Sequence, residues 1–122
     1  MERPLYERLG GYDAIVSVVD IFLPKMTSDS KLKRFWDHRG ADGLAREKQL
    51  LIDFLCHASG GSMVYTGRNM KIAHQGMRID NEDWGKLVNY LTESMDQLSV
   101  PSREKGEVLG FVETLKNEIV EV

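Results

Sequence analysis

A histidine in a stretch without acidic residues is the first candidate for chemistry in this chain. His74 lies in the segment YTGRNMKIAHQGMRI at residues 65–79, and the wider window 54–79 contains no Asp or Glu. The chain has 19 acidic residues among 122. At that rate about four would be expected in the window. The sequence therefore keeps negative charge away from His74.

The neighbours of His74 indicate what an imidazole could bind there. Met70 lies one helical turn earlier, and Arg68 and Lys71 are close in the sequence, as an anionic ligand would require. A neutral imidazole in an apolar, acid-free setting is suited to metal ligation. Haem iron fits best, because the carboxylated edge of haem needs cations nearby.

Other chemistries fit the sequence less well. A zinc site needs three or four ligands at defined spacing, and Cys56, His57 and His74 form no such pattern. Cys56 and His57 are neighbours whose side chains diverge on a helix, which argues against a nucleophile and its base. We interpret Cys56 as a buried small hydrophobic residue. His57 and His38 are interpreted as exposed.

Composition limits the other classes of protein to which the chain could belong. The chain of 122 residues, 42% hydrophobic and 29% charged, predicts a single domain over residues 1–122. A net charge of −3 disfavours a nucleic-acid partner. No apolar run is long enough for a membrane span, and no amino-terminal signal is recognisable. One cysteine excludes an internal disulfide, and the cytoplasm is the expected compartment.

Hydrophobic residues at helical spacing predict an all-α chain, with no convincing strand or repeat. Four longer helices are expected. The first begins near Tyr12 or Asp13, the second runs from Leu44 to about Ser59, and the third follows a cap at Asp80 or Asn81. Ser99 and Pro101 start the fourth, whose apolar face extends to Ile119. Shorter helical turns are expected at 30–37 and 68–75. Pro24 is expected to disturb the first long helix, because proline removes a hydrogen bond and usually bends the helix.

Several ordered motifs resemble the truncated haemoglobins of the first group. LYERLGG lies near the start, FW at 35–36, FL and GG within 54–61, and YTGRNMKIAHQGM begins at Tyr65. The resemblance covers about residues 5–120. It implies a truncated globin-like, two-over-two helical sandwich around one haem b.

The same resemblance implies site residues. His74 matches the proximal iron ligand, and its second ring N–H would find an acceptor one turn back, at the carbonyl of Met70. Arg68 and Lys71 are expected at the haem propionates, with Arg46 as a further candidate. The haem contacts that we expect are Phe35, Trp36, Leu51, Phe54, Leu55, Tyr65, Arg68, Met70, Lys71, His74, Trp84 and Leu87.

The distal side departs from the family pattern. The family usually has a tyrosine directly after the phenylalanine that matches Phe22, and this chain has Leu23. Counting back from Gly60 without gaps places Glu47, Leu50 and Leu51 at the polar or ligating positions. The familiar Lys-Gln pair occurs two positions early, at 48–49. Either the preceding loop is longer or the helix register shifts. The distal pocket that we expect comprises Phe22, Leu23, Glu47, Lys48, Leu50 and Leu51.

The leading hypothesis is a haem protein that binds O2, NO or CO. Oxygen should be held weakly unless Glu47, Lys48 or Gln49 reaches it, and Lys48 as a sixth iron ligand is an open alternative. Redox turnover of NO or nitrite would need an electron donor that the sequence does not identify, so enzymatic activity is left open. The rival hypothesis is a globin-shaped sensor or interaction module without bound haem.

Overall fold

The computed structural model describes residues 3–37, 40–61, 65, 67 and 69–122. Its described elements are all helical, which confirms the all-α prediction. They are α1 (Leu5–Leu9), α2 (Tyr12–Ser28), the 3-10 turn η1 (Leu32–Phe35), α3 (Ala41–Ala58), α4 (Met70–His74), α5 (Asn81–Gln97), α6 (Ser102–Glu113) and α7 (Lys116–Ile119).

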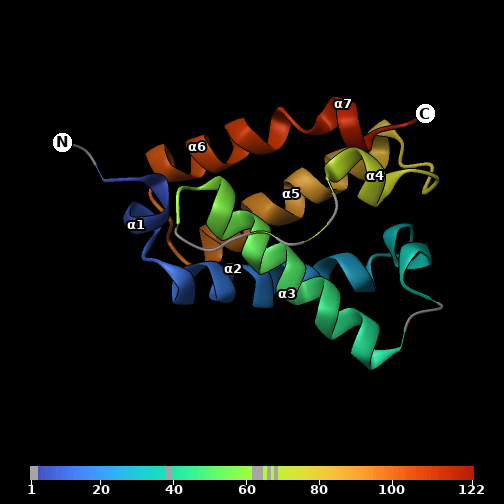
Figure 1. Cartoon of the computed structure of the whole chain (residues 1–122), viewed down its shortest axis with the longest axis horizontal. Helices are drawn as coiled ribbons and strands as arrows, with labels where there is room; N and C mark the ends of the chain where they lie inside the picture. Colours follow the sequence, from blue (N-terminus) through green and yellow to red (C-terminus); the bar gives the residue numbers. More distant parts are fainter. Residues whose placement is uncertain (1–2, 38–39, 62–64, 66, 68) are drawn as a thin grey trace.

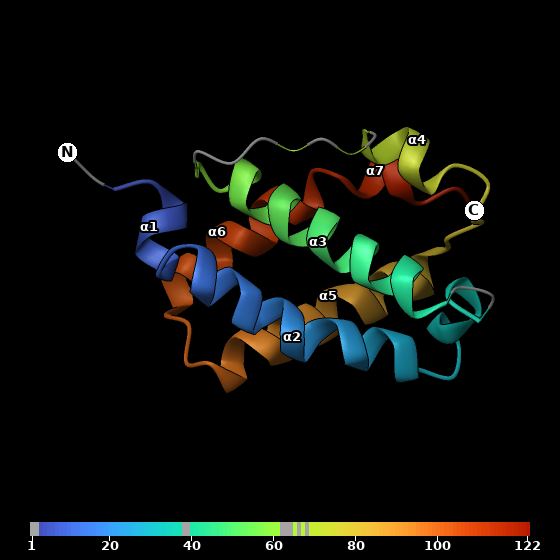
Figure 2. The same cartoon turned by 60° about the horizontal axis from the view of Figure 1, so that its bottom comes forward.

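The long helices form two crossed pairs. α2 packs against α3 and against α5, and α5 packs against α6. In Figure 1 α3 runs diagonally across α2, and in Figure 2 the two helices lie alongside each other, while α5 and α6 lie side by side as the second pair. The short helices α4 and α7 contact each other at one end of this sandwich. The arrangement agrees with the expected two-over-two architecture.

Helix α1 was not expected as an element, because five residues are too few to show a periodicity. Tertiary contacts hold it in place instead: the Tyr6 N–H donates to the Ser59 carbonyl over 2.8 Å, and Arg8 Nη2 donates to Glu107 Oε1 over 2.8 Å. Gly60 ends α3 with a φ of 99°, a conformation that side chains other than glycine rarely adopt. A Cβ at Gly61 would lie 2.9 Å from the Cys56 carbonyl oxygen. The second glycine pair thus lets α1 approach the end of α3.

Helix α2 continues through Pro24 to Ser28, so the proline does not end it. Proline has no N–H to donate to the carbonyl four residues earlier, and this loss falls in the last turns of the helix. The buried side chains of Ile15, Val19, Phe22 and Met26 hold α2 in the core on both sides of the proline.

The turn after α2 is organised by a buried carboxylate. Asp29 accepts hydrogen bonds from the N–H groups of Lys31 (2.8 Å) and Leu32 (3.1 Å), and from Lys86 Nζ (3.1 Å). The Tyr90 hydroxyl also donates to Asp29, and this bond contributes most to lowering the pKa of the carboxyl well below its ordinary value. The predicted helical turn is present as η1, which carries Phe35 toward the interior.

The predicted start of α3 differs from the structure, and the predicted start of α5 agrees with it. α3 begins at Ala41, three residues before the predicted Leu44. Asp80 caps α5 as predicted, and its carboxylate accepts the Asp83 N–H over 2.8 Å while Asp83 accepts the Asp80 N–H over 3.1 Å. This reciprocal capping box fixes the start of α5.

The last predicted helix is divided into α6 and α7. The N–H groups of Thr114 and Leu115 bond three residues back, to Phe111 (3.2 Å) and Val112 (2.9 Å), which tightens and ends α6. The apolar stripe continues across this break, with Val112 and Ile119 both buried, so periodicity alone could not reveal it.

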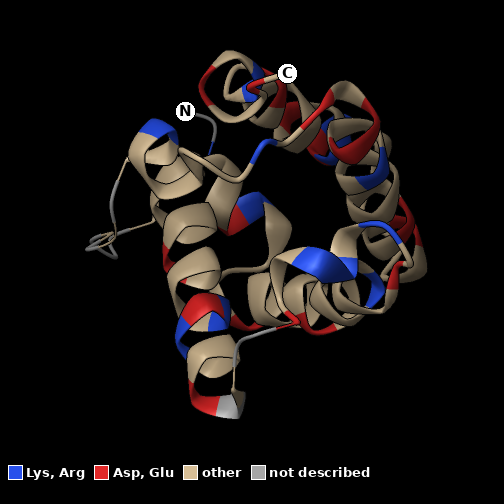
Figure 3. Ribbon diagram, turned by 90° about the vertical axis from the view of Figure 1, so that its right-hand side faces the viewer, with Lys and Arg blue, Asp and Glu red and all other residues tan. Residues whose placement is uncertain are grey.

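Most charged residues of the described chain lie at exposed or half-buried positions, with Asp29 and Asp83 as buried exceptions. In the view of Figure 3, Lys and Arg are interspersed with Asp and Glu over the helices. Cys56 is fully buried, as expected, and His57 is exposed. His38 lies outside the described residues. Within the described part of the chain, no helix combines the length and the apolar character that crossing a bilayer requires.

Candidate functional site

His74 is the last residue of the single-turn helix α4. Asn69 caps the start of this helix, since its side-chain oxygen accepts the Ile72 N–H over 2.9 Å. His74 Nδ1 lies 2.8 Å from the Met70 carbonyl oxygen. A carbonyl only accepts, so Nδ1 carries a proton, and in the neutral imidazole Nε2 is the nitrogen with the free lone pair. The helix therefore presents an imidazole in the tautomer that ligates a metal through Nε2.

This histidine lines a cavity of about 600 Å³, within the range of sites that hold a cofactor. Aromatic and aliphatic side chains from α2, η1, α3, α4, α5 and α7 form most of its wall. The expected site residues that line it are Phe22, Leu23, Phe35, Trp36, Glu47, Leu50, Leu51, Phe54, Tyr65, Met70, His74, Trp84 and Leu87. Residues far apart in the sequence are thus brought around one imidazole.

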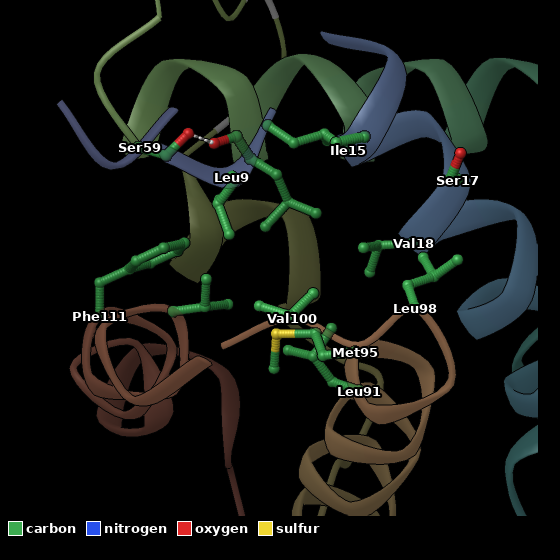
Figure 4. A pocket seen from close by; sticks show the side chains of 13 residues that line it. Leu9, Ile15, Ser17, Val18, Ser59, Leu91, Met95, Leu98, Val100 and Phe111 are labelled. Carbon is green, nitrogen blue, oxygen red and sulfur yellow. Dashed lines mark hydrogen bonds between the residues drawn. The ribbon is translucent and has the colours of Figure 1, made fainter. Parts of the chain in front are cut away.

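Three expected site residues are placed elsewhere. Lys48 forms an ion pair with Asp20 of α2 and does not line the cavity. Lys71 is exposed and is likewise absent from the wall. Leu55 lines a second, smaller apolar cavity of about 220 Å³. Figure 4 shows this second cavity, with Leu9, Phe111 and Met95 around it. Arg68 lies outside the described residues.

Phe35 of η1 and the following Trp36 are fixed by ionic and ring contacts. The rings of Phe35 and Trp36 meet edge to face, with centroids 6.0 Å apart at 86°. The Arg34 guanidinium lies 4.1 Å from the Phe35 ring centroid and binds both carboxylate oxygens of Asp83, at 2.6 and 3.1 Å. Across the cavity wall, the rings of Phe54 and Tyr65 make a similar contact at 5.3 Å and 76°. These contacts limit the movement of the flat side chains that face the cavity.

The side chains of α3 that face the cavity show the register of this helix. Glu47, Leu50 and Leu51, which the count back from Gly60 without gaps placed at the distal positions, all line the cavity. Gln49 Nε2 instead donates to Asp53 (2.9 Å) and to the Tyr12 hydroxyl (3.3 Å). The Lys-Gln pair therefore faces α2 and the surface.

One polar pair interrupts the apolar wall on the α3 side. Trp36 Nε1–H donates to Glu47 Oε2 over 3.1 Å. Leu23, Leu50 and Leu51 have no polar side-chain atoms. Arg46 also lines the cavity, and its side chain is exposed, as a cation at the cavity mouth would be.

The cavity wall includes residues that the sequence analysis missed: Met26, Leu32, Gly43, Gly67, Ala73, Met77, Ile79, Asp83 and Ile119. A detectable signal existed for Ile79. It directly precedes the cap Asp80, and Trp84 follows at the fourth helical position, which is the spacing of a hydrophobic staple. For Met77, which follows α4 in a turn, no periodicity could have indicated the cavity.

The donor set suits a haem. Within the described residues, no group of three or more His, Cys, Asp or Glu side chains is placed to hold a bare metal ion. A single imidazole in a large apolar cavity matches a metal whose other ligands come from a macrocycle. The volume, the flat aromatic contacts and the tautomer of His74 are all consistent with that group.

A two-over-two helical sandwich that encloses one apolar cavity with one imidazole defines a class, the small haem-binding globins. The chain belongs to the bacterial-like globin family, whose family model matches residues 4–121. It is therefore a haem-binding globin with haem b as its cofactor.

Its relatives are truncated hemoglobins. The chain is 32% identical over 115 residues to a group 1 truncated hemoglobin of Mycolicibacterium paratuberculosis, covering 94% of this chain and 82% of the relative. It matches the crystal structure of truncated hemoglobin from Tetrahymena pyriformis, Fe(III) form, with a TM-score of 0.89, 27% identity and coverage of 98% and 100%. The 2/2 hemoglobin of a Synechococcus species, in the cyanomet state with covalently attached heme, matches with a TM-score of 0.88, 27% identity and coverage of 97% and 98%. These likenesses agree with the first-group truncated haemoglobin resemblance.

Proposed function

We propose that this globin binds diatomic gases, with His74 Nε2 as the proximal ligand of the haem iron. The observation that carries the proposal is the 2.8 Å hydrogen bond between His74 Nδ1 and the Met70 carbonyl, which leaves Nε2 as the ligating atom of a cavity-lining imidazole. When bound, haem b would supply the iron that takes O2, NO or CO, and His74 would hold that iron to the protein.

The chain supplies the shape and polarity of the pocket. Phe35, Phe54, Tyr65 and Trp84 are proposed to contact the faces and edges of the haem, because they offer flat apolar surface to the cavity. Arg46 is placed at the cavity wall with an exposed side chain, which supports a role at a propionate. Arg68 and Lys71 stay expected propionate partners from the sequence.

The α3 side of the pocket favours ligands that need little hydrogen bonding. Leu23, Leu50 and Leu51 offer no donor, and Trp36 Nε1–H is directed to Glu47. O2 gains more than CO from a donor, since it acquires more negative charge on binding. We therefore propose rapid oxygen release and a preference for CO and NO. Lys48, which is paired with Asp20, is not part of this proposal.

Nitrite reduction is a redox reaction for which the cavity wall offers a proton carrier, Glu47. Nitrite needs one electron and two protons to become NO and water. A one-electron donor protein would supply the electron, and Glu47 is a titratable group at the wall that can hold and pass a proton. NO production from nitrite, measured with an electrode under reducing conditions, should fall in Glu47→Leu; equal rates in the variant and the wild type would contradict this role.

The experiment that tests gas binding is an absorption spectrum of the purified protein in its ferric, ferrous and ferrous-CO states. A Soret band near ~410 nm that shifts on adding CO supports a haem iron with an accessible axial position. A protein that stays colourless after addition of haem would contradict the proposal and favour a sensor or interaction module without haem.

A further inference from the structure

The turn that follows His74 has an unusual backbone. Gly76 and Arg78 both have positive φ values, 84° and 57°. For a residue other than glycine, such a conformation is strained and persists only where surrounding contacts hold it. Helix α4 is one turn of five residues, too short to be stable by itself. The position of His74 must therefore be stabilised from outside α4.

The contacts that hold this turn come from Glu121, which follows α7. Its Oε2 accepts the Gly76 N–H over 3.0 Å, and its Oε1 accepts the Arg78 N–H over 2.8 Å. The backbone continues the contact, since the N–H groups of Glu121 and Val122 donate to the Ile79 carbonyl over 2.8 and 3.3 Å. The two backbone N–H groups lower the pKa of the Glu121 carboxyl, so the carboxylate form is favoured.

The turn that Glu121 holds forms part of the wall of the haem cavity. Met77, between the two bonded amides, lines the cavity, and its N–H donates to the His74 carbonyl over 3.2 Å. Ile79 lines the same wall. Glu121 itself is exposed and does not line the cavity. Its carboxylate can therefore act on the site only through the turn.

We propose that Glu121 is a positioning residue of the haem site: its carboxylate clasps the amides of Gly76 and Arg78 and thereby fixes the imidazole of His74 against the iron. The proposal rests on the proposed ligation by His74. In Glu121→Gln one carboxylate oxygen becomes an NH2 group, which cannot accept a backbone N–H. The clasp then loses one bond and its charge while the side-chain length is kept.

The test uses haem-loaded wild type, Glu121→Gln and the control Glu118→Gln, which removes the same charge from an exposed residue of α7. Amide hydrogen exchange at Gly76 and Arg78 reports the clasp. The iron–histidine stretching band of the ferrous protein, measured by resonance Raman, reports the imidazole. Haem transfer to an acceptor protein reports retention. We expect faster exchange, a shifted and broadened band and about tenfold faster haem loss in Glu121→Gln, since a charged hydrogen bond is lost, and no change in Glu118→Gln.

Two results would overturn the positioning role. One is unchanged amide exchange in Glu121→Gln, which would mean that the clasp does not hold the turn. The other is faster exchange with an unchanged iron–histidine band and unchanged haem loss. Protection of the α5 amides and an unchanged helical circular dichroism signal verify that the variant is folded. Failure of the proposed ligation by His74 can be distinguished from failure of the positioning role. In that case the ferrous spectrum of His74→Gly would be the same as that of the wild type.

Discussion

The imidazole of His74 is oriented by a single backbone carbonyl, that of Met70, 2.8 Å from Nδ1. This bond sets which ring nitrogen is available, and the donation also makes the imidazole a stronger ligand. Because α4 ends at His74, the side chain depends on its own helical turn for orientation and on the following turn for position. The candidate iron ligand is thus oriented by a contact within its own helix and positioned by a turn that the distant Glu121 holds.

His74→Gly should remove the bond between iron and protein while the fold is retained, because the apolar cavity wall is unchanged. Added imidazole should then restore a ligand to the iron. The measurement is the ferrous absorption spectrum with and without imidazole, and His57→Gly, at an exposed position of α3, is the control. A His74→Gly spectrum identical to that of the wild type would show that another residue ligates the iron.

Leu23→Tyr should slow oxygen release by about 10- to 100-fold, because its hydroxyl would add a charge-assisted hydrogen bond of about 1.5–3 kcal/mol to a wall that now lacks a donor. Stopped-flow dissociation of O2 measures the effect, and CO release should change little. Leu23→Phe is the matched control, since it adds the ring without the hydroxyl. If the wild type already releases oxygen slowly and the tyrosine has no effect, another polar group, such as Trp36 Nε1–H turned away from Glu47, must already supply the donor.

At the scale of the elements, the cavity exists because α3 packs chiefly on α2, while α4, α5 and α7 form the opposite walls. Contacts of short helices hold the two ends of the sandwich: α1 packs against the end of α3, and α7 packs against α4. Neither α1 nor α4 would be stable alone at five residues. Both short helices therefore stay folded only through their contacts with the rest of the protein.

Gly61→Ala should destabilise the contact between α1 and α3, because its Cβ would lie 2.9 Å from both the Cys56 carbonyl oxygen and the Tyr6 ring. We expect a loss of about 1–3 kcal/mol in the free energy of unfolding. Gly110→Ala is the matched control: its Cβ meets nothing within 4 Å inside α6, so a gain of about 0.5–1 kcal/mol is expected. Urea unfolding measures both. Equal effects of the two substitutions would contradict the steric argument.

The two helices that flank the cavity offer different cations to the propionates. Arg46 of α3 lines the cavity and Lys71 of α4 does not, although both are exposed. Arg46→Ala should speed haem transfer to an acceptor protein by up to about fivefold, the modest effect of an exposed ion pair, and more at low salt. Lys71→Ala is the comparison and should have a smaller effect. If Lys71→Ala speeds haem transfer more than Arg46→Ala does, the propionates lie on the α4 side.

At the scale of the whole molecule, carboxylates connect segments that are distant in the sequence. Asp80 binds Lys31 Nζ at 2.8 and 2.9 Å, Asp83 binds Arg34, and Asp29 binds Tyr90. Together they attach the η1 region to α5. Hydrogen bonding to Lys31 lowers the pKa of Asp80 from 3.8 to about 2. The pKa of Asp29 and that of Asp83 are lowered as well.

These depressed pKa values predict acid sensitivity. A carboxyl whose pKa is lower in the folded than in the unfolded state contributes stability that is present above its unfolded pKa and is lost as the pH falls toward the folded value. For Asp80 that window runs from 3.8 to about 2. The free energy of unfolding, from urea titrations followed by circular dichroism, should therefore decrease through this range.

Asp80→Asn should weaken this pH dependence, because asparagine keeps the helix cap but does not titrate. Asp37→Asn, at an exposed position outside the helices, is the control and should leave the dependence as in the wild type. Identical pH profiles for wild type and Asp80→Asn would show that the ion pair with Lys31 does not stabilise the folded state.

Much of the site could be predicted from the sequence because its residues repeat at helical spacing or stand in ordered motifs. His74 was identified by its acid-free surroundings, and Asp80 by the capping residues after it. The break between α6 and α7 was missed because the apolar stripe continues through it. Lys48 was expected near the iron because the Lys-Gln pair is recognisable, yet only the packing of α3 on α2 shows that this side chain meets Asp20.

The sequence by itself determined the helical class, the long amphipathic helices, the candidate ligand and the loss of a distal tyrosine, because each depends on residue type and local spacing. The tertiary structure alone decided that Lys48 pairs with Asp20, how Trp36 meets Glu47, and how Glu121 reaches the turn after His74. Those contacts join residues 11 to 45 positions apart. No local preference encodes such pairs, since they form only when packing brings separate helices together.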